Sequence, residues 1–94
     1  MDGLEPWETS LVGNWEVIEG KIVGDAAERR ISALLAGSYL QKLASREGGW
    51  TTLYRDRTDG RLWELTYPHS GMQGGGPHQL EVMDAADAAR LYNL

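Results

Sequence analysis

The sequence contains no cysteine and no phenylalanine. Without cysteine the chain has neither disulfide bonds nor thiolate ligands for a metal, and a reducing compartment fits this composition. Without phenylalanine, the four tryptophans and four tyrosines must supply much of the apolar core. Because both side chains carry a polar group, they suit half-buried positions and interfaces better than a sealed interior.

The chain also lacks a long apolar run, and no stretch approaches the length that spans a bilayer. Its first residues, MDGLEPWETS, carry acids where a secretory signal would carry basic residues, and no apolar segment follows them. We therefore expect a cytoplasmic protein without membrane contacts.

Basic residues are missing from the first 20 positions, which hold five acids. The whole chain of 94 residues has a formal net charge of −5. Such a charge repels nucleic acid and attracts basic partners, although mild acidity also aids solubility without any partner. We expect no direct binding to nucleic acid.

A chain of 94 residues has room for one hydrophobic core. Residues 1–10 lack periodicity and are predicted to form a flexible arm, with residues 11–94 as the single domain. Alternating apolar residues in LVGNWEVIEGKIVGD predict two short strands with a possible turn at Glu19-Gly20. QLEVM at 79–83 predicts a last strand, and Asp84, with Asp87 three residues later, begins a short C-terminal helix.

The clearest helix is predicted between Asp25 and the Gly48-Gly49 pair. Asp25 and Glu28 have the spacing of a capping box, and two glycines permit a left-handed C-cap. One face of this helix is formed by residues at helical spacing: Ala27, Ile31, Leu34, Leu35, Ser38 and Tyr39. The far side carries further apolar residues: Ala33, Ala36, Leu40 and Ala44. Either the helix packs on both sides, or Gly37-Ser38 bends its axis.

The segment WTTLYRDRTDGRLWELTYP predicts a hairpin that turns at Asp59-Gly60. A loop of two or four residues would place six side chains on one face: Trp50, Thr52, Tyr54, Trp63, Leu65 and Tyr67. A three-residue loop would separate these aromatic side chains. We choose the first register, because burying them together stabilises the fold by several kcal/mol at about 25 cal/mol per Å² of apolar area. The outer face would then comprise Leu53, Arg55, Leu62, Glu64 and Thr66.

Together these elements predict an α+β domain. It consists of an antiparallel β-sheet with one long helix packed on a face and a short C-terminal helix.

The only two histidines bracket a glycine-rich segment, HSGMQGGGPH, at residues 69–78. His69 and His78 do not have the spacing of a helical zinc motif, and zinc would need two more ligands from nearby carboxylates. Ser70 follows His69, but a catalytic triad also needs an orienting acid and an oxyanion hole. We predict no catalytic residue, no metal and no cofactor.

The glycine run does not match a phosphate-binding loop. It lacks the Gly-Lys-Ser/Thr sequence that opens a helix, and Pro77 and a predicted strand follow it. Consecutive glycines more simply indicate backbone with positive φ, or backbone that passes close to another surface.

Three acids surround the hairpin turn and alternate with arginines. They are Asp56, Asp59 and Glu64, and the arginines are Arg55, Arg57 and Arg61. Paired carboxylates can perform acid–base catalysis, but alternating charges on a hairpin more often form cross-strand ion pairs. The pattern is weak evidence for an enzyme.

Residues 49–77, GWTTLYRDRTDGRLWELTYPHSGMQGGGP, resemble immunity protein family 27 of bacterial polymorphic toxin and contact-dependent inhibition systems. The likeness rests on GW-x-TLYRD, on DGR-x-WELTYP and on the GGGP that follows. LVGNWEVIEGKIVGD and the segment ending near YLQKLA also fit, so the resemblance covers most of the chain from Leu11 onward. Members of the family often have a second proline after GGGP. His78 stands there in this chain, which weakens any special role for that histidine.

The resemblance implies a small cytoplasmic protein, without catalysis of its own, that binds and neutralises a cognate toxin. The partner would be a toxin C-terminal domain encoded by a neighbouring gene. A nuclease with a basic cleft is one candidate, because acidic groups could occupy that cleft in place of phosphate.

We accordingly predict partner contacts from Asp56, Asp59 and Glu64 and from the loop residues Met72 and Gln73. Nothing in the sequence demands more than a monomer or a weak dimer. Two alternatives stay open. One is a small metal-dependent or hydrolytic enzyme built on His69, His78 and nearby carboxylates, and the other is a scaffold module unrelated to toxins.

Overall fold

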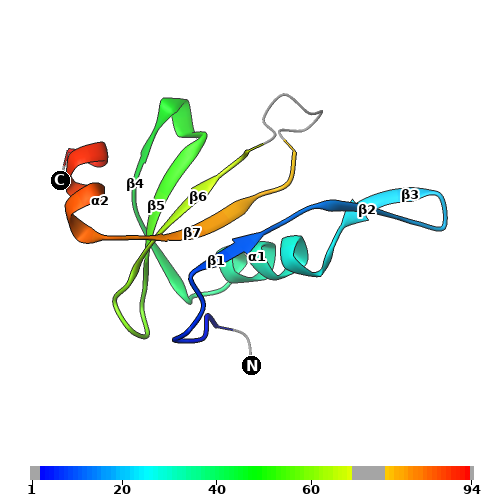
Figure 1. Ribbon diagram of the computed structural model, residues 1–94, viewed down its shortest axis with the longest axis horizontal. Helices are drawn as coiled ribbons and strands as arrows, with labels where there is room; N and C mark the ends of the chain where they lie inside the picture. The colour runs from blue at the N-terminus through cyan, green and yellow to red at the C-terminus, as the bar shows by residue number, and fades with distance from the viewer. Residues whose placement is uncertain (1–2, 69–75, 94) are drawn as a thin grey trace.

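The computed structural model describes residues 3–68 and 76–93, and a five-stranded antiparallel sheet lies at its centre (Figure 1). The strand order is β1-β7-β6-β5-β4, so the first strand pairs with the last. The strands are β1 (Ser10–Val12), β4 (Leu40–Arg46), β5 (Thr51–Asp56), β6 (Leu62–Thr66) and β7 (Gln79–Met83). The strand predicted at 79–83 is confirmed.

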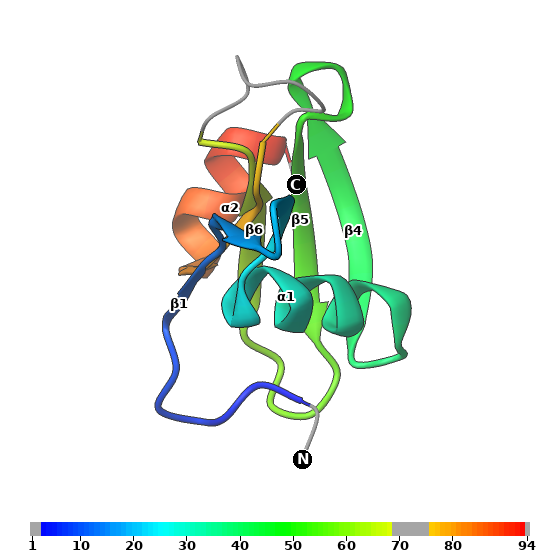
Figure 2. The same cartoon turned by 90° about the vertical axis from the view of Figure 1, so that its right-hand side faces the viewer.

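Two helices, α1 (Ala26–Ala36) and α2 (Ala85–Tyr92), cover opposite faces of this sheet (Figure 2). One buried cluster joins α1 to the sheet and includes Ile31, Leu34, Trp63, Leu65 and Leu80. A second cluster joins α2 to the other face and includes Leu53, Ala88 and Tyr92. Asp84 caps α2 as predicted, because its Oδ1 accepts the Asp87 N–H at 2.8 Å. The predicted α+β class is confirmed.

The predicted long helix is wrong beyond Ala36. Gly37 ends α1, and its N–H donates to the carbonyl oxygen of Ala33 at 3.0 Å. The following residues form β4, which pairs with β5 along its length and contains a bulge between Lys42 and Ala44. Gly37-Ser38 is therefore the end of the helix and not a bend within it.

The glycine pair that was predicted to cap the helix closes a hairpin instead. Gly48 and Gly49 have φ values of 69° and 96° and belong to a 3-10 turn, Glu47–Gly49, between β4 and β5. Glycine adopts such angles without steric cost. The positive φ that favours glycine at a helix C-cap thus also allows the tight connection between β4 and β5.

The hairpin of β5 and β6 has the predicted aromatic register. Tyr54 lies opposite Trp63, and the Asp56 N–H donates to the Arg61 carbonyl oxygen at 2.8 Å to close a four-residue loop, residues 57–60. The predicted outer face is wrong for Leu53, which is 0% exposed. Its side chain is covered because α2 packs on that face of the sheet.

A second, two-stranded sheet projects from the body (Figure 1). It consists of β2 (Trp15–Ile18) and β3 (Lys21–Gly24), joined by the predicted turn at Glu19-Gly20. Both turn residues have positive φ, 52° and 78°, as a two-residue hairpin loop of this hand requires. The two strands predicted in this segment are confirmed.

Residues 3–9 precede β1 and contact the body of the domain. Leu4 is part of the cluster beneath α1, and Arg30 forms a hydrogen-bonded ion pair with Glu8. Arg30 also donates to the Gly3 carbonyl oxygen at 3.0 Å. The flexibility of residues 1–10 and the domain boundary at residue 11 stay predictions. Within the described ranges, no helix is long and apolar enough to cross a membrane.

Candidate partner-binding site

Asp56, the first of the predicted contact residues, is buried and forms hydrogen bonds within the β5–β6 loop. It is 2% exposed at the end of β5. Its Oδ1 accepts the Thr58 N–H at 2.8 Å, and its carbonyl oxygen accepts the Gly60 N–H at 2.8 Å. Its Oδ2 has no hydrogen-bond partner among the described residues. Asp56 can therefore shape the hairpin loop, but it presents almost no surface to a partner.

Asp59 lies in the exposed loop and is bound to Arg61. Its Oδ1 accepts the Arg61 backbone N–H at 3.0 Å, and its Oδ2 accepts Arg61 Nε at 2.8 Å. The backbone hydrogen bond from Arg61, aided by the Arg61 guanidinium, lowers the pKa of Asp59 below its usual value. Asp59 thus stays ionised at neutral pH and is accessible to a partner.

Arg61 ties this loop to the N-terminal segment. Its guanidinium donates to the carbonyl oxygens of Glu8 at 2.6 Å and Glu5 at 2.9 Å. It also lies over the ring of Trp63, 5.0 Å from the ring centroid. The hairpin tip is consequently held in one orientation by contacts far apart in sequence.

Glu64 lies on the sheet face beneath α2. Its Oε2 accepts the Tyr92 hydroxyl at 2.7 Å and forms a longer contact, 3.4 Å, with Arg46 Nη2. Its side chain is only 15% exposed. Burial, together with the hydrogen bond to Glu64, raises the pKa of Tyr92 from 10.0 to about 12. Glu64 therefore helps to dock α2, and its remaining surface is small.

The Tyr92 interaction predicts a loss of stability at alkaline pH. Well below pH 10 the phenol is protonated in both the folded and the unfolded chain, so Tyr92 contributes fully to the free energy of unfolding. As the pH rises from about 10 to 12, the unfolded chain loses this proton first, and we expect the free energy of unfolding to fall by up to about 2 kcal/mol. Denaturant titrations of the wild type and Tyr92→Phe across this range measure the effect. The difference in free energy of unfolding between the two proteins should shrink as the pH rises. A constant difference would contradict the raised pKa of Tyr92.

Four residues named by the sequence analysis, His69, Ser70, Met72 and Gln73, lie outside the described residues. The remaining histidine, His78, has a clear structural partner. Its backbone N–H donates to Glu28 Oε1 at 2.8 Å, and its Nδ1 lies 2.5 Å from Glu28 Oε2. Its ring also contacts that of Tyr67, with centroids 4.8 Å apart.

The contact between Glu28 and His78 corrects the predicted capping box. Asp25 does cap α1, since its Oδ1 accepts the Glu28 N–H at 2.9 Å. The Glu28 carboxylate does not return this bond. It is buried and binds the segment before β7, while the Asp25 N–H donates to the Asn14 carbonyl oxygen at 2.8 Å. Glu28 and His78 are 50 positions apart in the sequence, so no local sequence pattern predicts that they pair.

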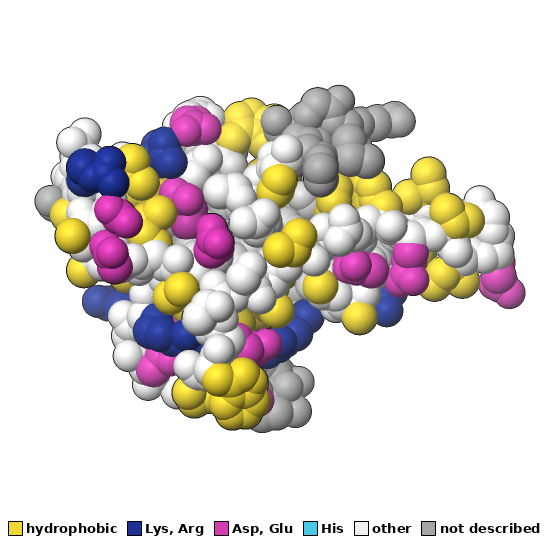
Figure 3. All heavy atoms as spheres, in the orientation of Figure 1, with side chains coloured by type: hydrophobic (Ala, Val, Ile, Leu, Met, Phe, Trp, Pro, Cys, Tyr) yellow, Lys and Arg dark blue, Asp and Glu magenta, His cyan; other side chains and the backbone are white. Residues whose placement is uncertain are grey.

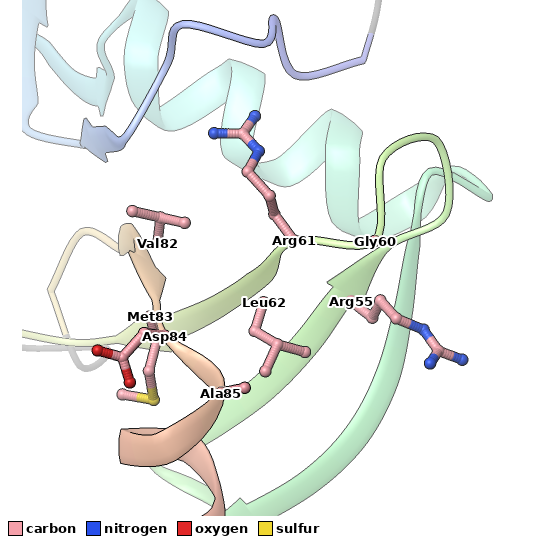
Figure 4. A pocket seen from close by; sticks show the side chains of 8 residues that line it. All are labelled: Arg55, Gly60, Arg61, Leu62, Val82, Met83, Asp84 and Ala85. Atoms are coloured by element: carbon pink, nitrogen blue, oxygen red, sulfur yellow. The ribbon is translucent and has the colours of Figure 1, made fainter.

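An open pocket of about 460 Å³ lies between the hairpin tip, β7 and the start of α2 (Figure 4). Its apolar part is formed by Leu62, Val82 and Met83. Arg55 and Arg61 point away from each other, and Arg61 reaches toward the N-terminal segment. The two arginines therefore do not converge on one point, and Asp84, the other charged residue of the lining, caps α2 through its Oδ1. In the part of the chain that the structure describes, no group of three or more His, Cys, Asp or Glu residues is placed to hold a metal ion.

Comparison with known proteins identifies the family. The family model for Immunity protein 27 matches residues 17–84. The chain belongs to the immunity protein 27 family. The resemblance read from the motifs is thereby confirmed. No curated protein and no solved structure matches the chain. Membership of an immunity family supports an immunity function and suggests a role without catalysis.

Proposed function

We propose that this chain neutralises a cognate toxin domain by forming a stoichiometric protein–protein complex with it. The observation that carries this proposal is the family match, which covers β3, α1 and the strands β4 to β7. The site agrees with it. Asp56, Glu64 and His78 are each bound within the fold, to Thr58, Tyr92 and Glu28 respectively.

The partner that best fits the charge of this protein is a basic one. The chain carries a formal net charge of −5, which speeds association with a positively charged surface. We place the partner among the toxin C-terminal domains encoded by a neighbouring gene of a polymorphic toxin or contact-dependent inhibition system. A nuclease domain, whose cleft binds phosphate, has the expected charge. The complex would form in the cytoplasm, where such a toxin meets its substrate.

Partner contacts are assigned to Asp59 at the hairpin tip, to the small exposed part of Glu64 on the sheet face beneath α2, and to Met72 and Gln73 of the glycine-rich segment. Asp56 contributes through the shape of the loop, because its own side chain is buried. Removing charge at Asp59 and Glu64 tests this assignment and keeps their other hydrogen bonds, with only the contact of Asp59 Oδ2 to Arg61 Nε lost. Asn keeps the oxygen that accepts the Arg61 N–H, and Gln keeps the one that accepts the Tyr92 hydroxyl.

We expect the double variant Asp59→Asn, Glu64→Gln to associate with the toxin about two- to fivefold more slowly at low salt, since rim charges act mainly on the association rate. The difference should shrink as salt screens the charges. Asp87→Asn is the control, because it removes one exposed acid from α2 and none from the hairpin tip. Stopped-flow mixing gives the rates. Equal slowing by the control would assign the effect to net charge alone.

Isothermal titration calorimetry tests the proposal itself. The chain is titrated into an inactivated toxin domain from the neighbouring gene. We expect saturation at one chain per toxin, with a dissociation constant in the nanomolar range or below, on the order of that found for tight protein–protein pairs. Absence of binding would refute the proposed function.

A further inference from the structure

The β2–β3 hairpin carries large apolar side chains that are exposed. It forms a sheet of two strands only and extends away from the five-stranded sheet (Figure 1). Hydrophobic and acidic side chains alternate along it (Figure 3). An isolated two-stranded hairpin is marginally stable in water, so a protruding one is usually fixed by its base or covered by a partner.

The pairing register divides this hairpin into two different faces. Trp15 lies opposite Gly24, and Val17 lies opposite Ile22, so the side chains of these pairs share one face. Every side chain on this face is apolar. Val17 and Ile22 are 69% and 71% exposed, and Trp15, nearer the body, is 38% exposed. We call this set, Trp15, Val17 and Ile22, the arm face.

The opposite face has a mixed character. Glu16 lies opposite Val23, and Ile18 lies opposite Lys21. Glu16 contacts Arg29 at 3.6 Å, but both side chains are at least 40% exposed, so this ion pair contributes little. The apolar character of the hairpin is therefore concentrated on the arm face. A contiguous exposed apolar patch of this kind marks an interaction surface in a soluble protein.

The base of the hairpin is held rigidly against α1. Asp25 Oδ1 accepts the Asn14 N–H at 3.2 Å, and the Asp25 N–H donates to the Asn14 carbonyl oxygen at 2.8 Å. Arg29 Nη1 donates to the Gly24 carbonyl oxygen at 2.7 Å. Since the same Asp25 caps α1, the hairpin and the helix share one anchor. A fixed arm loses little conformational entropy on binding.

We infer that the arm face docks onto the toxin domain, at an apolar patch flanked by basic groups. This inference rests on the proposed function and names a surface for it. Charge selects this occupant over a second copy of the chain. The charged residues of the hairpin, Glu16, Glu19 and Lys21, sum to −1 (two acids and one base) on a chain of −5. Two copies would repel each other, whereas a basic toxin would be attracted.

The test compares Thr substitutions on the two faces, because Thr keeps the β-branched shape that strands favour and removes apolar surface. Val17→Thr, Ile22→Thr alters the arm face. Ile18→Thr is the control, since Ile18 lies on the same hairpin, is 47% exposed and points the other way. Calorimetry against the inactivated toxin domain gives the dissociation constants. Thermal unfolding checks the fold, and size-exclusion chromatography with light scattering gives the oligomeric state without toxin.

We expect the arm-face variant to bind at least about tenfold more weakly, the control to bind within about twofold of the wild type, and both to keep the wild-type unfolding temperature. Equal binding by all three proteins would overturn this inference and leave the proposed function standing. Equal weakening by Ile18→Thr, unfolding of the arm-face variant, or a wild-type dimer that this variant abolishes would also overturn it. Absence of wild-type binding would instead refute the proposed function.

Discussion

Replacing Trp63 by alanine is expected to lower the free energy of unfolding by about 3–5 kcal/mol. Trp63 is 0% exposed and packs in the cluster that joins α1 to the sheet. The guanidinium of Arg61 covers its ring, so the change also loosens the residue that holds the hairpin tip to the N-terminal segment. For a domain with a typical stability of about 5–15 kcal/mol, this loss leaves the variant marginal. Urea denaturation followed by circular dichroism measures it.

Trp50 provides the matched control for this substitution. It precedes β5 on the same hairpin and was predicted to share a face with Trp63, but it is 51% exposed and contacts Tyr67 edge-on at 5.2 Å between ring centroids. We expect Trp50→Ala to cost about 1 kcal/mol or less. Equal losses for the two alanine variants would contradict the placement of Trp63 in the core.

Gly13→Ala is expected to be the most damaging small substitution, at about 3 kcal/mol. A Cβ atom at position 13 would lie 2.2 Å from Glu28 Oε1 and 2.9 Å from the His78 carbonyl oxygen. The Glu28 side chain cannot move aside freely, because it is buried and binds the backbone and ring of His78. The Gly13 N–H also donates to that His78 carbonyl oxygen at 2.8 Å. The added methyl group therefore forces apart the chain at Gly13, helix α1 at Glu28 and the segment before β7 at His78.

Two further variants isolate the steric cause at position 13. Gly20→Ala places a Cβ in open space but at a positive φ of 78°, so we expect only the backbone cost of about 1 kcal/mol. Combining Gly13→Ala with Glu28→Ala removes the carboxylate that the methyl group meets. The double variant should then be clearly more stable than the sum of the two single losses predicts. Strict additivity would show that Glu28 is not the obstacle.

The sequence predicted local elements well and failed where a distant strand decided the outcome. The β2–β3 turn, the Asp84 cap and the β5–β6 register all depend on residues close in the chain, and they are as expected. The segment 40–46 has apolar residues at helical spacing, yet it pairs with β5 and forms an edge strand. Tertiary pairing overrides a local helical pattern of this kind.

The same limit applies to the individual side chains of the candidate site. Sequence placed Asp56, Asp59 and Glu64 together around the hairpin, and it could not foresee that Asp56 is buried or that α2 covers Glu64. The buried pair of Glu28 and His78 joins α1 to the segment before β7 and has no local signature. The arm face was visible only as alternating apolar residues, because exposure depends on where the hairpin projects from the body.

If this chain protects by binding its toxin, the activity of the toxin must fall in proportion to the amount of chain added. The active toxin domain is held at a fixed concentration well above the dissociation constant, and its reaction is followed while the chain is added. We predict a linear fall in activity that reaches zero at one chain per toxin, unchanged when His78 is replaced by a fold-preserving variant. Full toxin activity in the presence of excess folded chain, or inhibition by far less than one chain per toxin, would contradict protection by stoichiometric binding.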